Sequence, residues 1–164
     1  MKKIFFLIIL MFTLVNSSFA ASSSSGSSSG SKITSNYDKA VKLIKAAKKY
    51  EKKEKVDKAN KRYNKAYKLL LISNKKKPSK ADTLNYLGFT ARKLGYYEKG
   101  ENYYLEGLAL EPNHKGINEY LGELYVVTNR IDLAKERLKI LKSCNCKEYQ
   151  ELKDIIDGTK KSKY

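Results

Sequence analysis

The 164 residues of the chain are enough for one domain, and 34 Lys and Arg residues against 17 Asp and Glu residues give a formal net charge of +17. The sequence holds one His and two Cys residues, and its carboxylates are scattered along the chain. We therefore predict neither an enzyme nor a cofactor-binding protein, because catalysis needs acids, bases, nucleophiles or metals gathered in one pocket.

Residues 1–20 have the pattern of a secretory signal peptide. Lys2 and Lys3 precede an apolar run at 4–15, and a small–bulky–small triplet ends at Ala20. This pattern predicts cleavage after Ala20 and a periplasmic or secreted protein with no transmembrane segment after cleavage. The alternative is an uncleaved anchor, but the apolar run would form only about 18 Å of helix, short of the ~30 Å core of a bilayer.

Residues 21–35 begin with the run ASSSSGSSSGS. This composition cannot form a core and is typical of a flexible Ser/Gly-rich linker. We interpret the linker as a tether for the domain that follows, and a reach-extending leash is the alternative.

The folded part is predicted to begin with an atypical helical hairpin at residues 40–80. Its apolar positions recur at helical spacing. They are Leu43, Ala46, Ala47, Tyr50, Val56, Ala59, Tyr63 and Ala66. The second helix is expected to be long, because Tyr67, Leu70 and Leu71 continue the stripe until the Lys-rich stretch before Pro78.

Residues 81–114 and 115–148 align as two copies of a 34-residue unit. The identical pairs are Tyr86/Tyr120, Leu87/Leu121 and Gly88/Gly122. Each copy predicts two helices, the first ended at Gly95 or at its counterpart Asn129, both of which tolerate left-handed geometry. Gly88 and Gly100 are too small to fill a core, so we expect close backbone approach there, with Tyr104 filling the space opposite.

A half-unit follows the second copy. Tyr149, Leu152, Ile155 and Ile156 restart the first-helix stripe, and Gly158 ends it. We predict a capping helix at 147–158 and a basic tail at 159–164. The predicted fold is all-α, an α-solenoid of about three helical hairpins plus this capping helix, over residues 36–158.

The middle unit resembles the tetratricopeptide repeat family. The family's pattern of large, small and aromatic positions and a closing Pro is met by Leu84, Leu87, Gly88, Ala91, Gly95, Tyr96, Tyr97, Gly100, Tyr104, Gly107 and Pro112. The next unit departs from the pattern at Asn118, Asn129 and Cys146. The resemblance covers nearly the whole chain after the linker.

The resemblance implies a concave groove, lined by the first helix of each unit, that takes a peptide segment of another protein. The residues expected to face it are Ile44, Lys48, Glu51, Asn85, Phe89, Arg92, Glu119, Glu123 and Val126. Phe89 beside Arg92 would be an anchor for a peptide, and the alternative is that Phe89 packs between neighbouring helices. Only Lys48 matches the carboxylate clamp of some family members, so we do not expect that clamp here.

The positive charge is concentrated in residues 32–80, which carry 18 basic and 4 acidic residues and hence +14, whereas residues 81–146 carry 9 of each. An alternative function is therefore an adaptor that binds a polyanion or touches an anionic membrane surface. The residues of that site would include Lys45, Lys49, Lys52, Lys53, Lys61 and Arg62. Plain solvation and codon bias also explain a lysine excess. Nucleic acid is not expected, because only four of the basic residues are Arg.

Two features remain with possible chemistry. Cys144 and Cys146 are predicted to lie in the turn before the capping helix, where they form a local disulfide, stay reduced or bridge to another chain. A redox role would rest on these two residues alone. A zinc site is not expected, because two thiolates and a single His fall short of the usual four ligands. His114 lies in a turn between units and is interpreted as structural. The function predicted from the sequence is thus a non-catalytic interaction scaffold of the cell envelope.

Overall fold

The computed structural model describes residues 34–162, and within that range the chain forms seven α-helices, one short 3₁₀ helix and no strand. The helices are α1 (Asn36–Glu51), α2 (Val56–Lys76), α3 (Ala81–Lys93), α4 (Tyr97–Leu110), α5 (Lys115–Val127), α6 (Ile131–Leu141), η1 (Lys142–Cys144) and α7 (Lys147–Ile156). The predicted signal peptide and residues 21–33 of the predicted linker lie outside the described residues. None of the helices in the described part combines the length and hydrophobicity that crossing a bilayer requires.

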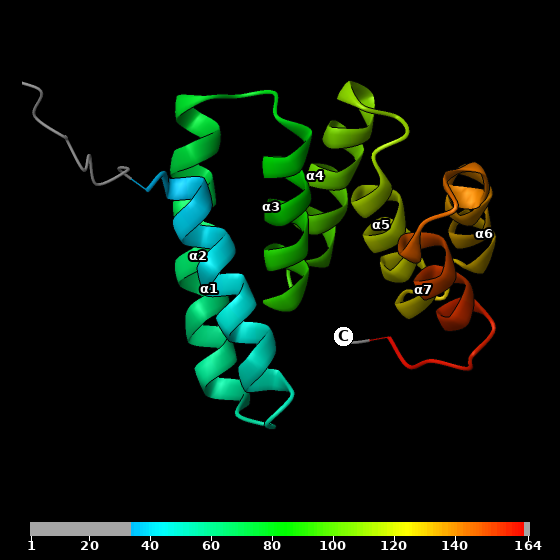
Figure 1. Cartoon of the computed structure of the whole chain (residues 1–164), viewed down its shortest axis with the longest axis horizontal. Coiled ribbons are helices and arrows are strands. Elements are labelled where there is room, and N and C mark those ends of the chain that lie inside the picture. Colours follow the sequence, from blue (N-terminus) through cyan, green and yellow to red (C-terminus); the bar gives the residue numbers. More distant parts are fainter. Residues whose placement is uncertain (1–33, 163–164) are drawn as a thin grey trace, which may run out of the picture. The chain divides into compact units, whose positions relative to one another are not determined.

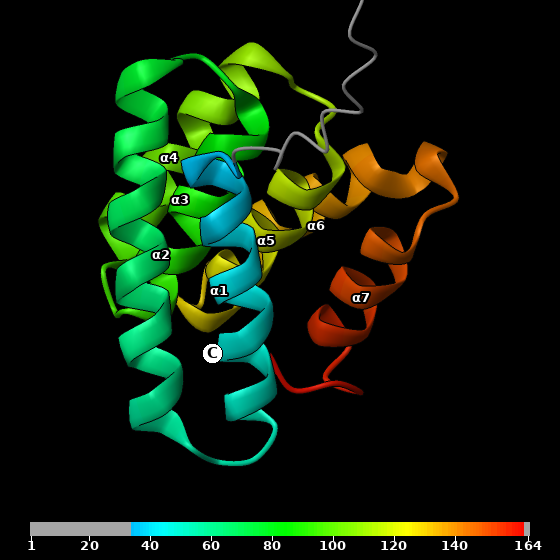
Figure 2. The ribbon, with the colours of Figure 1, turned by 60° about the vertical axis from the view of Figure 1, so that its left-hand side comes forward.

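Consecutive helices pair into three hairpins. The closest neighbours are α1 with α2, α3 with α4, and α5 with α6, while α2 also packs on α3 and α4 on α5. Helix α7 lies against both α5 and α6 at the end of the series (Figures 1 and 2). The all-α solenoid predicted from the sequence is confirmed.

Side-chain caps mark where two of the helices begin. Ser35 forms a capping box with Asp38, in which the Ser35 hydroxyl accepts from the Asp38 N–H at 3.1 Å. The last residue of the predicted linker is therefore a helix cap. His114 caps α5 through its Nδ1 atom, which accepts from the Ile117 N–H at 3.1 Å. His114 therefore has a structural role as a helix cap, in agreement with the sequence-based interpretation.

The helix ends follow the left-handed positions of the repeat. Gly95 has φ +83° after α3, and Asn129 has φ +58° at the corresponding place after α5. Both residues reverse the chain into the second helix of their hairpin. Asn tolerates this conformation better than most residues with a side chain, so the change from Gly to Asn preserves the turn.

Small residues set the distance between helices. A Cβ atom added at Gly88 would overlap the ring of Tyr104, and one at Gly100 would come within 3.1 Å of the Gly88 carbonyl oxygen. At Gly122 the overlapping side chain is Leu152 of α7. The third hairpin thus differs from the second. In the second hairpin Tyr104 of α4 fills the space beside the glycine, whereas in the third Leu152 of the capping helix fills it.

The buried side chains form two adjoining clusters. The first joins α1, α2 and α3 and includes Ile44, Tyr63, Leu70, Leu87 and Phe89. The second joins the later helices through Tyr104, Ile117, Leu121, Leu124 and Ala134. Leu71, which we expected to continue the apolar stripe of α2, is instead 39% exposed.

The turn between α6 and α7 holds both cysteines. The sulfur atoms of Cys144 and Cys146 are bonded in the structure, and their Cα atoms lie 5.2 Å apart. Asn145, between them, adopts φ +44°. This arrangement is the local bridge, one of the three alternatives that the sequence leaves open.

Candidate peptide-binding groove

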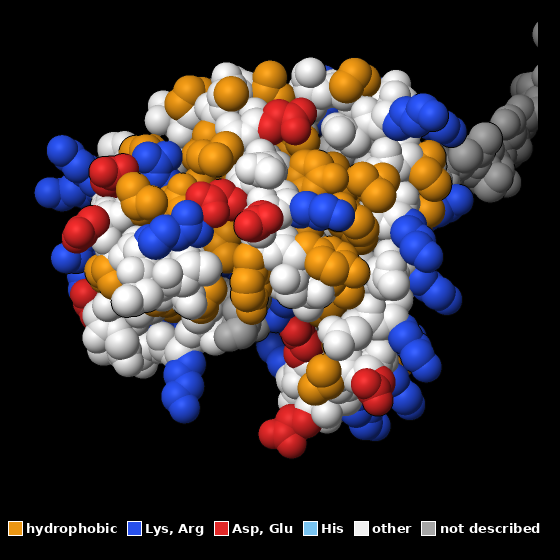
Figure 3. Space-filling view, turned by 180° about the vertical axis from the view of Figure 1, so that it is seen from behind, with side chains coloured by type: hydrophobic (Ala, Val, Ile, Leu, Met, Phe, Trp, Pro, Cys, Tyr) orange, Lys and Arg blue, Asp and Glu red, His pale blue; other side chains and the backbone are white. Residues whose placement is uncertain are grey.

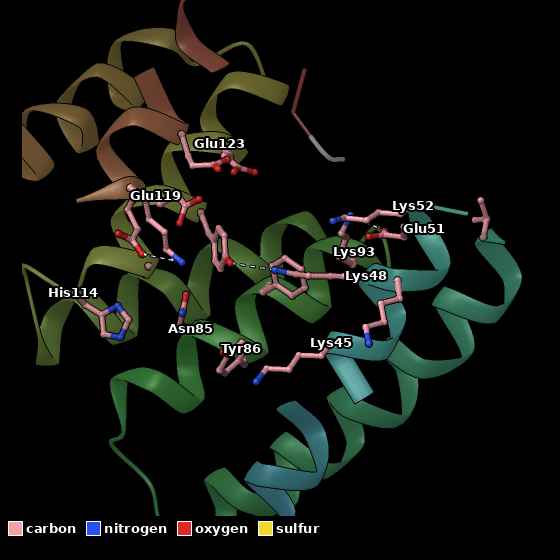
Figure 4. A pocket seen from close by; sticks show the side chains of 18 of the residues that line it. Lys45, Lys48, Glu51, Lys52, Asn85, Tyr86, Lys93, His114, Glu119 and Glu123 are labelled. Carbon is pink, nitrogen blue, oxygen red and sulfur yellow. Dashed lines mark hydrogen bonds and ion pairs between the residues drawn. The ribbon is translucent and has the colours of Figure 1, made fainter. Parts of the chain in front are cut away.

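A groove with a volume of about 1160 Å³ lies between α1 and α3 on one side and α5 and α7 on the other (Figure 4). Its side chains come from the first helix of all three hairpins and from the capping helix. This is the arrangement that the repeat predicts, because first helices stack side by side along one face of a solenoid.

One side of the groove carries mainly positive charge. Lys45, Lys48 and Lys49 of α1 and its C-cap residue Lys52 line it, and we call these four residues the lysine wall. Figure 4 shows Lys45, Lys48 and Lys52 on the same side of the cavity. Figure 3 shows further Lys and Arg side chains along the edge formed by the first hairpin. The lysine wall is thus continuous with the most basic part of the surface.

The other side carries carboxylates. Glu119 of α5 with Glu148 and Glu151 of α7 line it, and we call these three residues the carboxylate wall. The division is not complete, because Lys147 also lies here with its Nζ atom 3.9 Å from Glu148. The two walls still present opposite charge across one cavity, which favours a ligand whose own charge is divided in the same way.

Aromatic rings form the floor between the walls. The ring centroids of Phe89 and Tyr120 lie 5.1 Å apart. The Lys48 ammonium lies 4.4 Å from the Phe89 centroid, and it also contacts the Tyr120 hydroxyl oxygen at 3.4 Å. Phe89 is only 1% exposed. The expectation of an exposed Phe89 anchor is therefore wrong, and its position is that of a residue packed between neighbouring helices.

Two ion-pair networks that include lining residues of the groove connect successive hairpins. Arg92 Nη2 of α3 lies 3.1 Å from Glu123 Oε2 of α5, and both side chains are almost fully buried. Lys93 Nζ lies 2.7 Å from Glu51 Oε1, whose second oxygen accepts from the Tyr63 hydroxyl at 2.8 Å. Each ion pair joins one hairpin to the next, so these charges are already paired within the protein.

The carboxyl group of Glu119 is strongly perturbed. Burial raises its pKa to about 8, and the nearby Glu123, Glu148 and Glu151 carboxylates add to this, while Lys48 opposes it. A large share of Glu119 is therefore protonated at neutral pH. The negative charge of the carboxylate wall therefore increases as the pH rises through about 8.

Comparison with known proteins found a likeness among solved structures. No protein-family model matches the chain, and the search of curated proteins found no match. Among solved structures, the chain is similar to the first tetratricopeptide repeat domain of Spaghetti (RPAP3) bound to the HSP90 peptide SRMEEVD. The two are 20% identical, with a TM-score of 0.47, and the match covers 77% of this chain and 98% of that one.

The packing inside the hairpins decides the fold. Gly88 against Tyr104, the paired left-handed ends at Gly95 and Asn129, and the side-by-side first helices are the features on which the sequence resemblance depends. The fold is an α-solenoid of three helical hairpins, packed as the sequence resemblance implied. Its groove lies where the resemblance implied a binding surface.

Six of the nine residues predicted for the groove line it, namely Lys48, Glu51, Asn85, Phe89, Glu119 and Glu123. The other three do not. Ile44 is 2% exposed in the first core cluster, Arg92 is buried with Glu123, and Val126 packs against the second cluster. The helical spacing placed these three on the correct side of their helices, but neighbouring helices cover them.

The residues predicted for an anion site divide into two groups. Lys45, Lys49 and Lys52 belong to the lysine wall, whereas Lys53, Lys61 and Arg62 lie outside the groove. Arg62 stacks on the ring of Tyr50, with the guanidinium carbon 4.3 Å from the centroid. The six residues thus do not all line the groove.

Sequence reasoning missed the contribution of α7. We expected this helix only to cover the last hydrophobic face, yet Glu148 and Glu151 line the groove. A signal was present, because residues three apart on a helix share a face, and this face lies beside the buried stripe of Leu152 and Ile155. Lys93, which follows Arg92, was missed as well.

Proposed function

We propose that this chain is a non-catalytic scaffold that binds a peptide segment of another protein in the groove. The observation that carries the proposal is the groove itself, a cavity of about 1160 Å³ with an aromatic floor between two oppositely charged walls. Grooves between helices are common binding sites for peptides. The partner is expected to be another protein rather than a nucleic acid.

The charge of the walls defines the chemistry of the ligand. A segment with an acidic end would place it against Lys45, Lys49 and Lys52, and a basic end would face Glu148 and Glu151. Charge complementarity of this kind sets orientation and suppresses wrong partners more than it adds affinity. The partly buried rings of Tyr86 and Tyr120, which line the groove, support apolar contacts with the middle of the segment.

Selection from a random peptide library would test the proposal. The Lys45→Ala/Lys49→Ala/Lys52→Ala variant removes the exposed part of the lysine wall. A matched control is Lys58→Ala/Lys61→Ala/Lys65→Ala, which removes the same charge from exposed positions of α2 outside the groove. We expect selected peptides to bind the first variant at least tenfold more weakly than the control. Equal affinity for the two variants, or no selected peptide, would overturn the proposal.

A location in the cell envelope is also proposed, and it rests on residues 1–20 alone. The test is fractionation of cells that express the full chain, with mass spectrometry of the N-terminus. Cleavage after Ala20 and recovery outside the cytoplasm are expected, and an intact N-terminus in the cytoplasmic fraction would contradict this location.

Contact with an anionic membrane is a separate candidate, and its support is the concentration of exposed lysines on α1 and α2. Vesicles of neutral and anionic lipid distinguish it from groove binding. Binding that requires anionic lipid and is released by moderate salt would favour it, and equal behaviour of the two lysine variants is then expected.

A further inference from the structure

The chain that follows α7 turns back along this helix. Gly158 adopts φ +73°, and the Asp154 carbonyl oxygen then accepts from the Thr159 hydroxyl at 3.1 Å and from the Lys160 N–H at 3.0 Å. In Figures 1 and 2 this segment runs from the end of α7 toward the side where α1 lies. The basic tail, residues 159–164, is therefore held at its start in a defined direction.

The tail then contacts the carboxylate wall. The Lys160 ammonium donates to Glu151 Oε2, and Glu151 is a lining residue of the groove. The bond with Glu151 raises the pKa of Lys160, and Glu123, which lines the same groove, also favours the charged form. The Ser162 hydroxyl oxygen is shielded from solvent. At least as far as Ser162, the segment lies on the protein.

We propose that residues 159–162, the part of the tail that the structure describes, are an intramolecular occupant of the carboxylate wall, which the basic end of a partner segment must displace. The inference deepens the proposed function and rests on it. The tail carries Lys160, Lys161 and Lys163 and no acidic residue. It therefore has the charge that the carboxylate wall selects, and Lys160 shows one lysine seated there.

The expected effect is modest. Lys160 is 34% exposed and Glu151 is 31% exposed, so the ion pair is partly solvated. A partly solvated pair favours the tail bound to the wall over the released tail by only a small factor. The apparent affinity of a competing ligand equals its affinity for the free wall multiplied by the fraction of molecules with a released tail. We expect removal of the pair to strengthen binding of a competitor about two- to fivefold.

A labelled peptide with the sequence of residues 157–164, DGTKKSKY, is the probe. Its affinity is measured by fluorescence anisotropy for the full chain, for Lys160→Ala and for Lys161→Ala. Lys161 is exposed and its replacement removes the same charge, so it is the matched control. Lys160→Ala is expected to bind the probe about two- to fivefold more tightly than the full chain and than Lys161→Ala. Equal affinity of the two variants would overturn the proposal.

Glu151→Gln tests the wall from the other side. Combined with Lys160→Ala, it should return the probe to the affinity of the unmodified chain or below, since the carboxylate that receives the lysine is gone. If the combined variant binds as tightly as Lys160→Ala alone, the probe binds elsewhere and the proposal fails.

Heteronuclear NOE values of the Thr159–Ser162 amides give a readout that needs no ligand. In the unmodified chain these amides should approach the values of α7, and in Glu151→Gln they should fall toward those of a free terminus. Free-terminus values in the unmodified chain would reject the tail as an occupant while leaving peptide binding in the groove intact. Ordered amides together with no selected peptide would instead reject the proposed function alone.

Discussion

Arg92 of α3 and Glu123 of α5 form an ion pair between two successive repeats, with the Nη2 and Oε2 atoms 3.1 Å apart and both side chains at most 2% exposed. The same guanidinium donates to the Tyr120 carbonyl oxygen. Sequence spacing predicted both residues to contact a ligand, yet they contact each other. A buried charge without its partner is costly, so we expect this pair to stabilise the contact between the two hairpins.

Glu123→Gln should therefore lower the free energy of unfolding by about 3 kcal/mol, because it leaves the Arg92 charge buried without its carboxylate. Urea denaturation followed by circular dichroism measures the change. Glu106→Gln, at an exposed position of α4, is the control and should change stability by less than about 0.5 kcal/mol. Similar values for the two variants would show that the pair has no structural role.

Gly88→Ala and Gly122→Ala should each destabilise the fold by about 1–3 kcal/mol, because the added methyl group overlaps Tyr104 or Leu152. The two positions differ in what can relieve the overlap. Gly122→Ala combined with Leu152→Ala should lose less stability than the sum of the two single changes, since one change makes room for the other. Strict additivity in thermal melts would contradict the contact between α5 and α7.

Glu119 predicts a specific pH dependence. Its pKa is raised from 4.5 to about 8 in the folded chain, so between these values the folded state holds a proton that the unfolded state has released. The contribution of this group to stability therefore falls as the pH rises from about 4.5 to about 8. Glu119→Gln removes that loss, so the variant should be more stable than the unmodified chain by at least about 1 kcal/mol at pH 8.5.

The stability difference between Glu119→Gln and the unmodified chain should nearly vanish at pH 4, where the Glu119 carboxyl is protonated in both states. Denaturation curves at several pH values measure it. Glu98→Gln, on the exposed face of α4, serves as the comparison. A difference for Glu119→Gln that stays flat across this range would contradict the raised pKa of the Glu119 carboxyl.

The bond between Cys144 and Cys146 gives the simplest test. Mass spectrometry of protein that is purified and alkylated without reductant should show neither cysteine modified and a peptide two hydrogens lighter than the reduced form. Two alkylated cysteines would exclude the local bridge, and dimers released by reductant would indicate a bridge between chains.

Much of the fold could be predicted from the sequence, because the information lies within short stretches of chain. The 34-residue period, the left-handed ends at Gly95 and Asn129 and the small residue at Gly88 each act on their own hairpin. The buried stripe of α7 likewise predicted a cap, since Leu152 and Ile155 need a neighbouring apolar face.

The site depended on relations between hairpins, and only the tertiary structure decided these. Helical spacing places Lys48, Arg92 and Glu123 on one side of the solenoid, but it does not determine the angle at which one repeat packs on the next. That angle buries Arg92 with Glu123, covers Phe89 with Lys48 and brings α7 across from α1. Local periodicity thus determined the helices and their order, whereas the packing between repeats determined which charges face the groove.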